Sequence, residues 1–293
     1  MNATEVFAEQ RPLLFTLAYE ILGSAADAED VVQESYLRWI TAGDVTHPHA
    51  YLVQIVTRQA LNALRTGKRR REHYVGNWLP EPIRTAPDVS EDAVLAESVS
   101  MAMLLILETL GPDERVVFIL HEVFGYSHPE IARMVEKSDT TVRQIAHRAR
   151  EHVRARRRRF MPEPQLARAA VDRFLMAAHT GDIDGLIAVM APGIVAVSDG
   201  GGHVAAARRP VVGPQRVAPF MAGLGRGAMA GSDVSFGSYN SMPAVLFCRA
   251  GTLDSVLLIE VTDGLITALY AIRNPEKLRD AGSIRTLTRK KVD

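Results

Sequence analysis

The segment from Ser138 to Arg159 carries eight arginines and only two acids, although the 293-residue chain has a formal net charge of zero. Arginine neutralises phosphates and hydrogen-bonds to base edges, so the segment has the chemistry of a nucleic-acid-binding element. Near its start, Thr140, Gln144 and Arg148 are side chains of the kinds that contact bases in the major groove. The alternative is a solvated basic helix at the end of a helical bundle.

The spacing of apolar residues predicts that this segment is an amphipathic helix. Ser138 or Asp139 can accept hydrogen bonds from the free N–H groups of its first turn. The apolar stripe consists of Val142, Ile145, Ala146, Ala149 and Val153.

Two more helices are predicted upstream. One begins at Pro129 and is separated from the basic helix by the short stretch 136–138; the other opens at Gly111. Two helices with a tight turn, the second of them basic, are typical of a helix-turn-helix, which favours DNA binding over a merely solvated helix. Arg157 and Arg158 in its tail are expected to contact phosphates uniformly.

Charge is segregated along the chain. Residues 1–110 hold nine basic and fifteen acidic side chains (net −6), residues 111–160 hold eleven and seven (net +4), and residues 161–293 hold fourteen and twelve (net +2). The neutral total therefore hides segments that suit different partners.

The N-terminal third is predicted to form helices over 5–22, 24–40 and 50–64. The second helix presents an outward strip that is acidic with one apolar anchor, a pattern that is usually just a solvated face. The strip consists of Asp30, Gln33, Glu34 and Leu37.

The third helix runs into a second basic cluster. Basic groups beside exposed aromatic rings suit single-stranded DNA, because bases stack on the rings while the phosphates meet the cations. The candidate side chains are Tyr51, Arg65, Lys68, Arg69 and Arg70.

These segments resemble a known family. The stretch SAADAEDVVQESYLRWI resembles region 2 of bacterial sigma factors, and GPDERVVFILHEVFGYSHPEIARMVEKSDTTVRQIAHRARE resembles their region 4. The resemblance covers residues 5–75 and 108–158, without the other sigma regions, as in the extracytoplasmic-function group. It implies that the strip of four residues on the second helix binds the clamp of core RNA polymerase.

The resemblance also implies the DNA contacts. The loop 41–51 and the following helix would open and hold the −10 element, and the helix over 138–148 would read the −35 element. The implied −35 residues are Thr140, Thr141, Arg143, Gln144, His147 and Arg148.

Two positions depart from the family pattern. Family members usually have an acid where this chain has Asn62, and a glycine near Glu136 at the turn. A non-glycine residue there is strained if its φ is positive.

Beyond the helix-turn-helix, the sequence changes character. Helices are predicted over 165–179 and 183–190, followed by strands over 194–197, 210–212, 234–239, 244–249 and 255–261 and a hairpin turn at Asp263-Gly264. Helices followed by a curved sheet indicate an α+β domain. The stretch FLMAAHTGDIDGLIAVMAPGIVAVSDGGG resembles the cone-shaped SnoaL-like, or nuclear-transport-factor-2-like (NTF2-like), fold.

A subgroup of these sigma factors, typified by mycobacterial sigma factor J, carries such a domain and lacks a cognate membrane anti-sigma factor. Three of its motifs match this chain: a WLPEP linker, a DGGG loop and an NPxKL tail. The residues implied to regulate the domains are Trp78, Leu79, Pro80, Asp199, Gly200, Gly201, Gly202, Asn274, Pro275, Lys277 and Leu278.

The expected fold class is therefore multidomain: two all-α modules followed by an α+β cone-shaped SnoaL/NTF2-like domain. The expected boundaries are 1–75 for region 2, 76–107 for a proline-stiffened linker, 108–160 for region 4 and 161–293 for the SnoaL-like domain. Trp78 and Leu79 either dock on a partner surface or cap the nearest helical core.

The expected function is a promoter-specificity subunit whose last domain modulates activity. The expected partners are core RNA polymerase, through its beta and beta-prime subunits, and promoter DNA, with a small-molecule ligand in the cup of the last domain as a further candidate. The alternative is that this domain is a ligand sensor or an isomerase- or cyclase-like enzyme using Asp199, His203, Asp233 and Tyr239. No acid–base pair is identifiable among them, so no catalytic residue is assigned and the chain is not expected to be an enzyme.

Other classes of protein are not favoured by the composition. The single cysteine, Cys248, excludes an internal disulfide and cysteine-based zinc sites, and His47 and His49 have no nearby carboxylate, so no metal or other cofactor is expected. With no apolar run of about 18 residues and no signal-like start, a cytoplasmic protein without membrane association is expected.

Overall fold

The chain folds into two compact units, each built from segments that are distant in sequence. The computed structural model describes residues 2–86, 92–156, 164–226 and 231–290, without the side chains of 68–72, 164–167 and 225–226. The first unit comprises Met1–His73, Ala86–Arg157 and Arg285–Asp293; the second comprises Tyr74–Thr85 and Arg158–Ile284. The chain thus passes between the units after residues 73, 85, 157 and 284.

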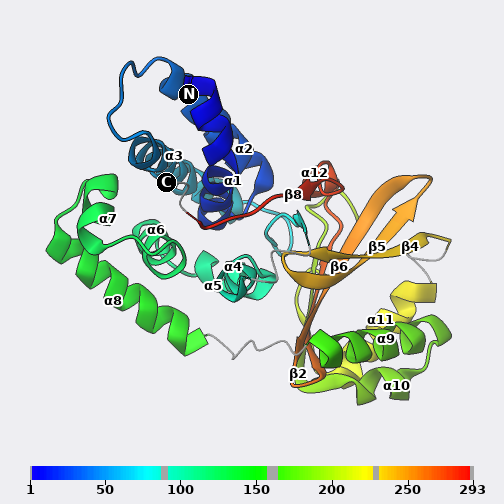
Figure 1. The fold of residues 1–293 in the computed structure, drawn as a ribbon. Coiled ribbons are helices and arrows are strands. Elements are labelled where there is room, and N and C mark those ends of the chain that lie inside the picture. Colours follow the sequence, from blue (N-terminus) through cyan, green and yellow to red (C-terminus); the bar gives the residue numbers. More distant parts are fainter. Residues whose placement is uncertain (1, 87–91, 157–163, 227–230, 291–293) are drawn as a thin grey trace. The chain divides into compact units, whose positions relative to one another are not determined.

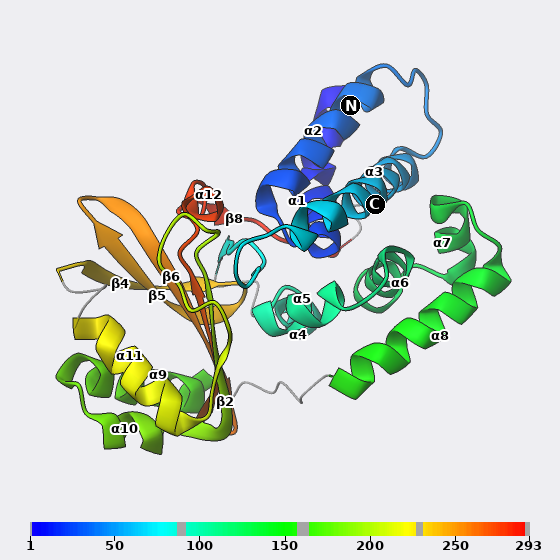
Figure 2. The same ribbon diagram turned by 180° about the vertical axis from the view of Figure 1, so that it is seen from behind.

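The first unit is helical (Figures 1 and 2). Its helices are α1 (Ala3–Leu22), α2 (Ala25–Ile40), α3 (Pro48–Glu72), α4 (Ala93–Ser98), α5 (Met101–Glu108), α6 (Pro112–Phe118), the π-helical turn η2 (Ile119–Val123), α7 (His128–Val135) and α8 (Asp139–Arg156). The helices predicted from periodicity are all present. Short polar caps set their starts: the Ser24 hydroxyl accepts from the Asp27 amide at 3.0 Å, and the Ser138 hydroxyl accepts from the Thr141 amide at 3.2 Å.

Within this unit, α1 packs against α2 and α3, and α6 packs against α8. The apolar face of α1 is wholly buried, because residues such as Leu13, Leu17 and Ile21 recur at helical spacing. The stripe predicted for α8, from Val142 to Val153, is buried as expected.

A buried arginine ties α6 to the end of α1. The Arg115 guanidinium donates from Nε (3.2 Å) and Nη2 (2.9 Å) to the backbone oxygen of Glu20, and its Nη1 pairs with the Glu108 carboxylate. Burial lowers the pKa of Arg115 to about 9. Burial also raises the pKa of Glu20 to about 8, although a hydrogen bond from Ser98 favours its ionised form.

The second unit is a curved mixed sheet with three helices over one face (Figures 1 and 2). Its strand order is β3-β2-β7-β6-β5-β4-β1-β8, with β2 parallel to β7 and the pairs β2–β3, β7–β6, β6–β5, β5–β4 and β4–β1 antiparallel. The strands are β1 (Arg84–Thr85), β2 (Met190–Asp199), β3 (Val211–Val212), β4 (Asp233–Tyr239), β5 (Met242–Arg249), β6 (Thr252–Thr262), β7 (Leu265–Ile272) and β8 (Ile284–Arg285). The helices are α9 (Pro164–Thr180), α10 (Ile183–Ala188), α11 (Pro214–Arg226) and the short α12 (Pro275–Leu278).

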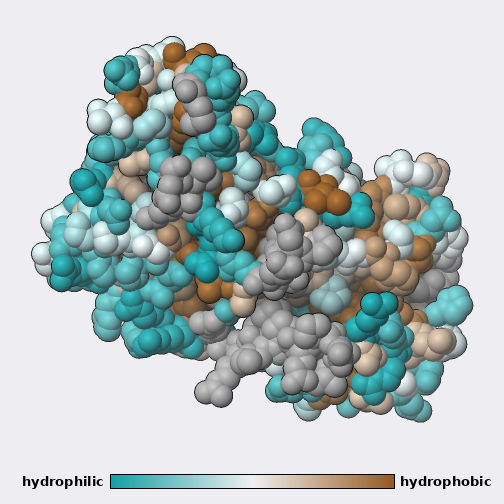
Figure 3. All heavy atoms as spheres, in the orientation of Figure 1, coloured by the Kyte–Doolittle hydropathy of each residue, from teal (hydrophilic) through white to brown (hydrophobic). Residues whose placement is uncertain are grey.

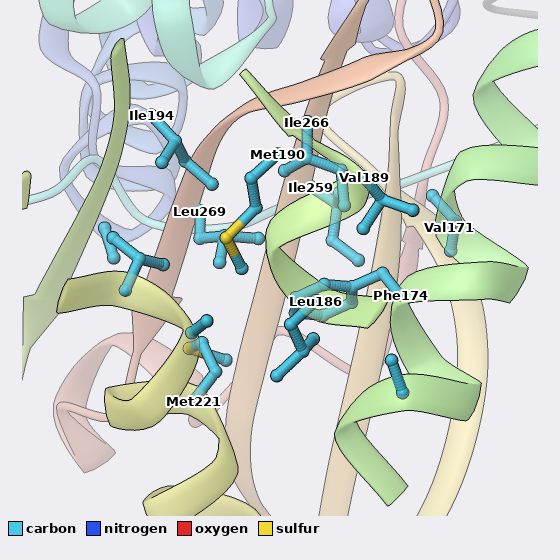
Figure 4. Close-up of a cluster of buried hydrophobic side chains, with 14 of the residues drawn as sticks. Val171, Phe174, Leu186, Val189, Met190, Ile194, Met221, Ile259, Ile266 and Leu269 are labelled. Atoms are coloured by element: carbon cyan, nitrogen blue, oxygen red, sulfur yellow. The ribbon is translucent and has the colours of Figure 1, made fainter. Parts of the chain in front are cut away.

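Apolar side chains fill the space between the helices and the sheet. Phe174 and Leu186 from the helices point toward Met190, Ile259 and Leu269 from the strands (Figure 4). This is the α+β fold class predicted from the sequence. The β6–β7 hairpin turns where predicted, with positive φ at both Asp263 (51°) and Gly264 (72°).

The two compact units do not coincide with the four segments expected from the sequence. Residues 74–85 join the C-terminal sheet, and 92–108, expected as mostly linker, contain α4 and α5. Helix α11 was not expected either, since its segment contains two glycines and two prolines.

From Arg285, the last residue of β8, onward, the C-terminal segment belongs to the helical unit. The Arg285 guanidinium pairs with Glu29 of α2, and the Thr288 amide donates to the Thr16 hydroxyl of α1 at 3.1 Å. Arg289 donates to both Asp92 carboxylate oxygens (2.7 and 3.0 Å) and to the backbone oxygen of Val123. The segment from Arg285 to Arg289 therefore ties α1, α2, α4 and η2 together.

Candidate nucleic-acid interface and linker docking site

The recognition face predicted for α8 is open. The apolar stripe of this helix is buried, and the side chains predicted to bind DNA are all exposed. They are Thr140, Thr141, Arg143, Gln144, His147 and Arg148. Hydrophilic side chains dominate the surface over α7 and α8 in Figure 3. Arg157 and Arg158, expected to contact phosphates, lie outside the described residues.

The cations of α8 pair with exposed or partly buried carboxylates. Arg143 pairs with Asp139 one turn earlier (2.9 Å), and the Arg148 guanidinium lies 3.9 Å from Glu114. Exposed pairs of this kind contribute about 0–1 kcal/mol, so phosphates or bases can replace the carboxylates at little cost.

The basic cluster on α3 differs from this open face. Arg65 is exposed and pairs with Asp113 of α6 at 2.8 Å. Tyr51 is half-buried, with its ring tilted against Trp39 (centroids 6.1 Å apart). Lys68, Arg69 and Arg70 lie in the last turns of α3, where side chains are not described.

The strip predicted on α2 is exposed. Asp30, Gln33 and Glu34 face outward, and Leu37 is 56% exposed. Gln33 and Leu37 also border a groove of about 430 Å³ between α2 and α1. The α1 side of the groove was not predicted, because Phe7 and Arg11 do not stand out in the sequence of that helix.

The three motifs around the C-terminal sheet meet at one buried carboxylate. Asp199 is fully buried; one of its oxygens accepts from the Tyr74 hydroxyl (2.6 Å) and the other from the Leu79 amide (2.9 Å) and the Lys277 ammonium (2.7 Å). Lys277 also donates to the backbone oxygen of Leu79. Its ammonium lies over the rings of Trp78 (4.4 Å) and Tyr74 (4.9 Å), in the geometry of a cation–π contact.

Asn274 completes this cluster. Its side-chain amide donates to the Tyr74 hydroxyl at 2.8 Å, and its side-chain oxygen accepts from the Glu276 amide, which starts α12. Burial, followed by the neighbouring Asp199, raises the pKa of Tyr74. We call the cluster of Tyr74, Leu79, Asp199, Asn274 and Lys277 the linker dock.

The glycine loop lets the segments approach closely. A Cβ on Gly201 would lie 2.4 Å from the Asn274 amide nitrogen, and one on Gly202 would lie 3.1 Å from Val75; both glycines also have positive φ. The Cβ of any other residue at 201 would therefore collide with Asn274.

The rest of the linker continues along the same sheet. Asn77 donates to the backbone oxygens of Ser198 (3.2 Å) and Ala207 (2.9 Å). Ile83 is buried and exchanges hydrogen bonds with Asn240, and Pro80 is buried as well. Trp78 and Leu79 thus dock on the C-terminal sheet; they do not cap a helical core. Tyr74, Asn77 and Asn240 were not predicted as part of this site, since each is an ordinary loop residue in the sequence.

The four polar residues that would act in an enzyme, Asp199, His203, Asp233 and Tyr239, do not line one pocket. Asp199 is hydrogen-bonded within the linker dock, and His203 lies on the surface, 3.7 Å from Glu276. Asp233 is exposed at the opposite end of β4 from the buried Tyr239. The described residues also contain no cluster of three or more side chains suited to hold a metal ion.

None of the helices in the described ranges has the length and apolarity needed to cross a membrane.

Comparison with known proteins matches both helical modules. The model for sigma-70 region 2 matches residues 6–70, and the model for sigma-70 region 4 matches residues 100–153. The chain is 35% identical to the ECF RNA polymerase sigma factor SigJ of Mycobacterium tuberculosis, over 92% of this chain and 91% of that protein. It is 32% identical to the probable ECF RNA polymerase sigma factor SigI of the same species, over 92% of each chain.

The similarity extends to the whole fold. The crystal structure of M. tuberculosis SigJ matches with a TM-score of 0.75 at 31% identity, covering 95% of this chain and 98% of that one. The match therefore includes the C-terminal sheet as well as the helical modules.

Proposed function

The chain belongs to the extracytoplasmic-function sigma factors of RNA polymerase, and from that premise we propose how its surfaces divide promoter recognition among them. As a sigma factor, it directs core polymerase to promoters for transcription initiation. It therefore acts beside the chromosome, in the cytoplasm.

Helix α8 reads the −35 element. The observation that carries this proposal is the continuous exposed polar face of α8, which starts at a capped turn and ends in arginines. In this proposal the exposed side chains of Thr140, Gln144 and Arg148 contact base edges, and those of Thr141, Arg143 and His147 contact phosphates or neighbouring bases.

The loop before α3 and the helix itself bind the −10 element. Tyr51 offers a ring face for an unpaired base, and Arg65, Lys68, Arg69 and Arg70 supply cations for the backbone. The half-burial of Tyr51 against Trp39 supports a stacking role, because the packed ring is already oriented.

The acidic strip of α2 binds core polymerase through the beta-prime clamp, with beta contacts elsewhere. Asp30, Gln33 and Glu34 repel phosphates, and the exposed Leu37 beside the groove of α1 and α2 offers an apolar anchor. Replacing Glu34 by lysine should reduce recovery of core polymerase in a pull-down without changing affinity for −35 DNA. Normal recovery would contradict the contact.

The C-terminal unit regulates the two DNA-binding modules through the linker. Region 2 is joined to region 4 by residues 74–107, and residues 74–85 of that connection are held by the sheet. The linker dock shortens the free part of the connection, which restricts the separation available to the modules. Transcription in vitro should differ between the full chain and a form ending near Arg159, in which Asp199 and Lys277 are absent. A form ending after Gly202 keeps Asp199 but lacks Lys277; equal activity of all three would rule out regulation.

A ligand-sensing or catalytic role for the C-terminal unit is not favoured. Apolar side chains pack together between its helices and sheet, and its buried carboxylates already have partners: Asp199 pairs with Lys277, and Glu260 accepts from the Tyr270 and Thr267 hydroxyls. Saturable binding of a small molecule by the purified chain would support a ligand-sensing role, and turnover would support a catalytic role.

A further inference from the structure

The turn of the helix-turn-helix contains a residue in an unfavourable backbone conformation. Glu136 ends α7 with φ 55° and ψ 46°, the left-handed region, and its amide closes the helix on the Ala132 oxygen. Glycine fits this position without strain, and a side chain with a Cβ does not. A glutamate at this strained position points to a role for its side chain that glycine could not perform.

That side chain faces a cation of α3. Nη1 of Arg58 lies 3.0 Å from the Glu136 carboxylate, its Nε donates to the backbone oxygen of Met134 (3.0 Å), and its Nη2 donates to that of Arg133 (3.2 Å). All three guanidinium nitrogens are thus engaged by the end of α7. The two carbonyls belong to the last turn of that helix, where the helix dipole is negative.

A second cation on α3 also pairs with an acid of region 4. Arg65 lies seven residues after Arg58, two helical turns along the same face, and its guanidinium pairs with Asp113 of α6. Gln54, one turn before Arg58, donates to the Arg133 oxygen at 3.2 Å. We call these contacts of Gln54, Arg58 and Arg65 with Asp113, the α7 end and Glu136 the clasp.

We propose that the clasp is an internal substitute for DNA: Arg58 and Arg65 form a phosphate-binding site on α3 that Glu136, the α7 carbonyls and Asp113 cover until the two modules separate. A guanidinium binds carboxylate and phosphate with the same planar donors, so Arg58 cannot serve both partners at once. The proposal rests on the assignment of α3 to the −10 region. Arg58 was not among the DNA-binding residues predicted from the sequence.

The exposure of the pair suits a contact that must open. The Arg58 side chain is 42% exposed and that of Glu136 is 71% exposed, so their attraction is screened and weak. Removing the Glu136 charge is expected to raise the affinity of α3 for DNA about two- to fivefold. On the recognition face of α8, Arg143 and Arg148 lie against side-chain carboxylates alone, whereas Arg58 on α3 also donates to two backbone oxygens.

The test measures binding of the full-length protein to a forked duplex that carries a −10 region and no −35 element, by fluorescence anisotropy. Glu136→Gln removes the charge and Glu136→Gly also removes the backbone strain, so both should bind more tightly and Glu136→Gly should stay folded. Glu151→Gln is the matched control, because Glu151 is an exposed acid of α8 that pairs with Arg154 of the same helix.

The gain must depend on Arg58. In an Arg58→Gln background, Glu136→Gln should give no further increase beyond the Glu151→Gln control. An equal gain from Glu136→Gln and Glu151→Gln, or a gain that persists without Arg58, would overturn the clasp.

Failure of the underlying assignment has a different signature. If Arg58→Gln leaves promoter binding by assembled holoenzyme unchanged, the face of α3 that carries Arg58 does not bind DNA and the proposal is wrong at its premise. If Arg58→Gln weakens the holoenzyme but Glu136→Gln has no effect on the free protein, the DNA site stands and only its covering by Glu136 is refuted.

Discussion

The linker dock and the clasp join segments far apart in sequence by the same chemistry, a cation against carboxylate and carbonyl oxygens, but they differ in burial. In the dock, the side chains of Asp199 and Lys277 are 0% and 7% exposed, and the carboxylate also accepts from two linker groups. In the clasp, the side chains of Arg58 and Glu136 are 42% and 71% exposed. A buried, fully hydrogen-bonded pair is costly to break on one side, whereas an exposed pair opens readily. The dock therefore acts as a fixed anchor, and the clasp as a contact that opens and closes.

The largest expected effect comes from breaking the dock. Lys277→Met leaves Asp199 buried without its cation, which should destabilise the second unit by about 3–5 kcal/mol. Thermal unfolding followed by circular dichroism measures this. Arg279→Met, an exposed neighbour beyond α12, should leave the transition unchanged. Equal melting of the two variants would show that the dock is not an anchor.

The recognition face of α8, whose cations have only weak internal partners, extends the comparison. Arg148→Ala on α8 should cost about 1–3 kcal/mol in affinity for −35 DNA and relax selectivity at one base position. Arg154→Ala, further along the same helix, should weaken all duplexes about equally. Unchanged −35 preference in Arg148→Ala would remove α8 from base recognition.

A buried carboxyl group in the helical unit gives a pH test. Because burial raises the pKa of Glu20 from 4.5 to about 8, its folded form holds a proton that the unfolded chain has released. Stability from this group is complete below about pH 4.5 and is lost as pH rises toward 8. The melting temperature of the wild type should therefore fall over this range relative to Glu20→Gln. Parallel curves for both proteins would show that Glu20 is ionised in the folded state.

The smallest effect is expected at the C-terminal segment. Burial raises the pKa of Asp92, but the hydrogen bonds and charge of Arg289 outweigh it and lower that pKa overall. Both side chains are partly exposed, so Arg289→Gln should cost only about 0.2–1 kcal/mol in stability of the helical unit. Lys290→Gln serves as the control. A loss well above that of the control, by several kcal/mol, would mean that the segment is part of the core.

Local features of the fold could be predicted because residues that are close together in the sequence determine them. Ser138 caps α8, the Asp263-Gly264 turn has two positive φ values, and the apolar stripe of α8 is buried, as short-range patterns indicate. The expected strain at position 136 is also present, since only glycine adopts that conformation freely.

Contacts between distant segments could not be predicted in the same way. The Leu79 amide and the Asp199 carboxylate are 120 residues apart, and the Thr288 amide and the Thr16 hydroxyl are 272 apart. The family motifs indicated that the linker, the glycine loop and the tail matter, but not that one carboxylate joins them. Arg115 resembles any solvent-facing arginine of an amphipathic helix, and only the tertiary packing shows it buried against Glu20.

The central claim is that this chain selects promoters through α8 and α3 as a subunit of RNA polymerase. The most direct test is to sequence the 5′ ends of RNA made in vitro from genomic DNA by core polymerase with the full-length protein. The expected result is a set of defined start sites with shared −35 and −10 elements, in which Arg148→Ala changes the preference at one −35 position. Start sites no different from those of core polymerase alone would contradict it.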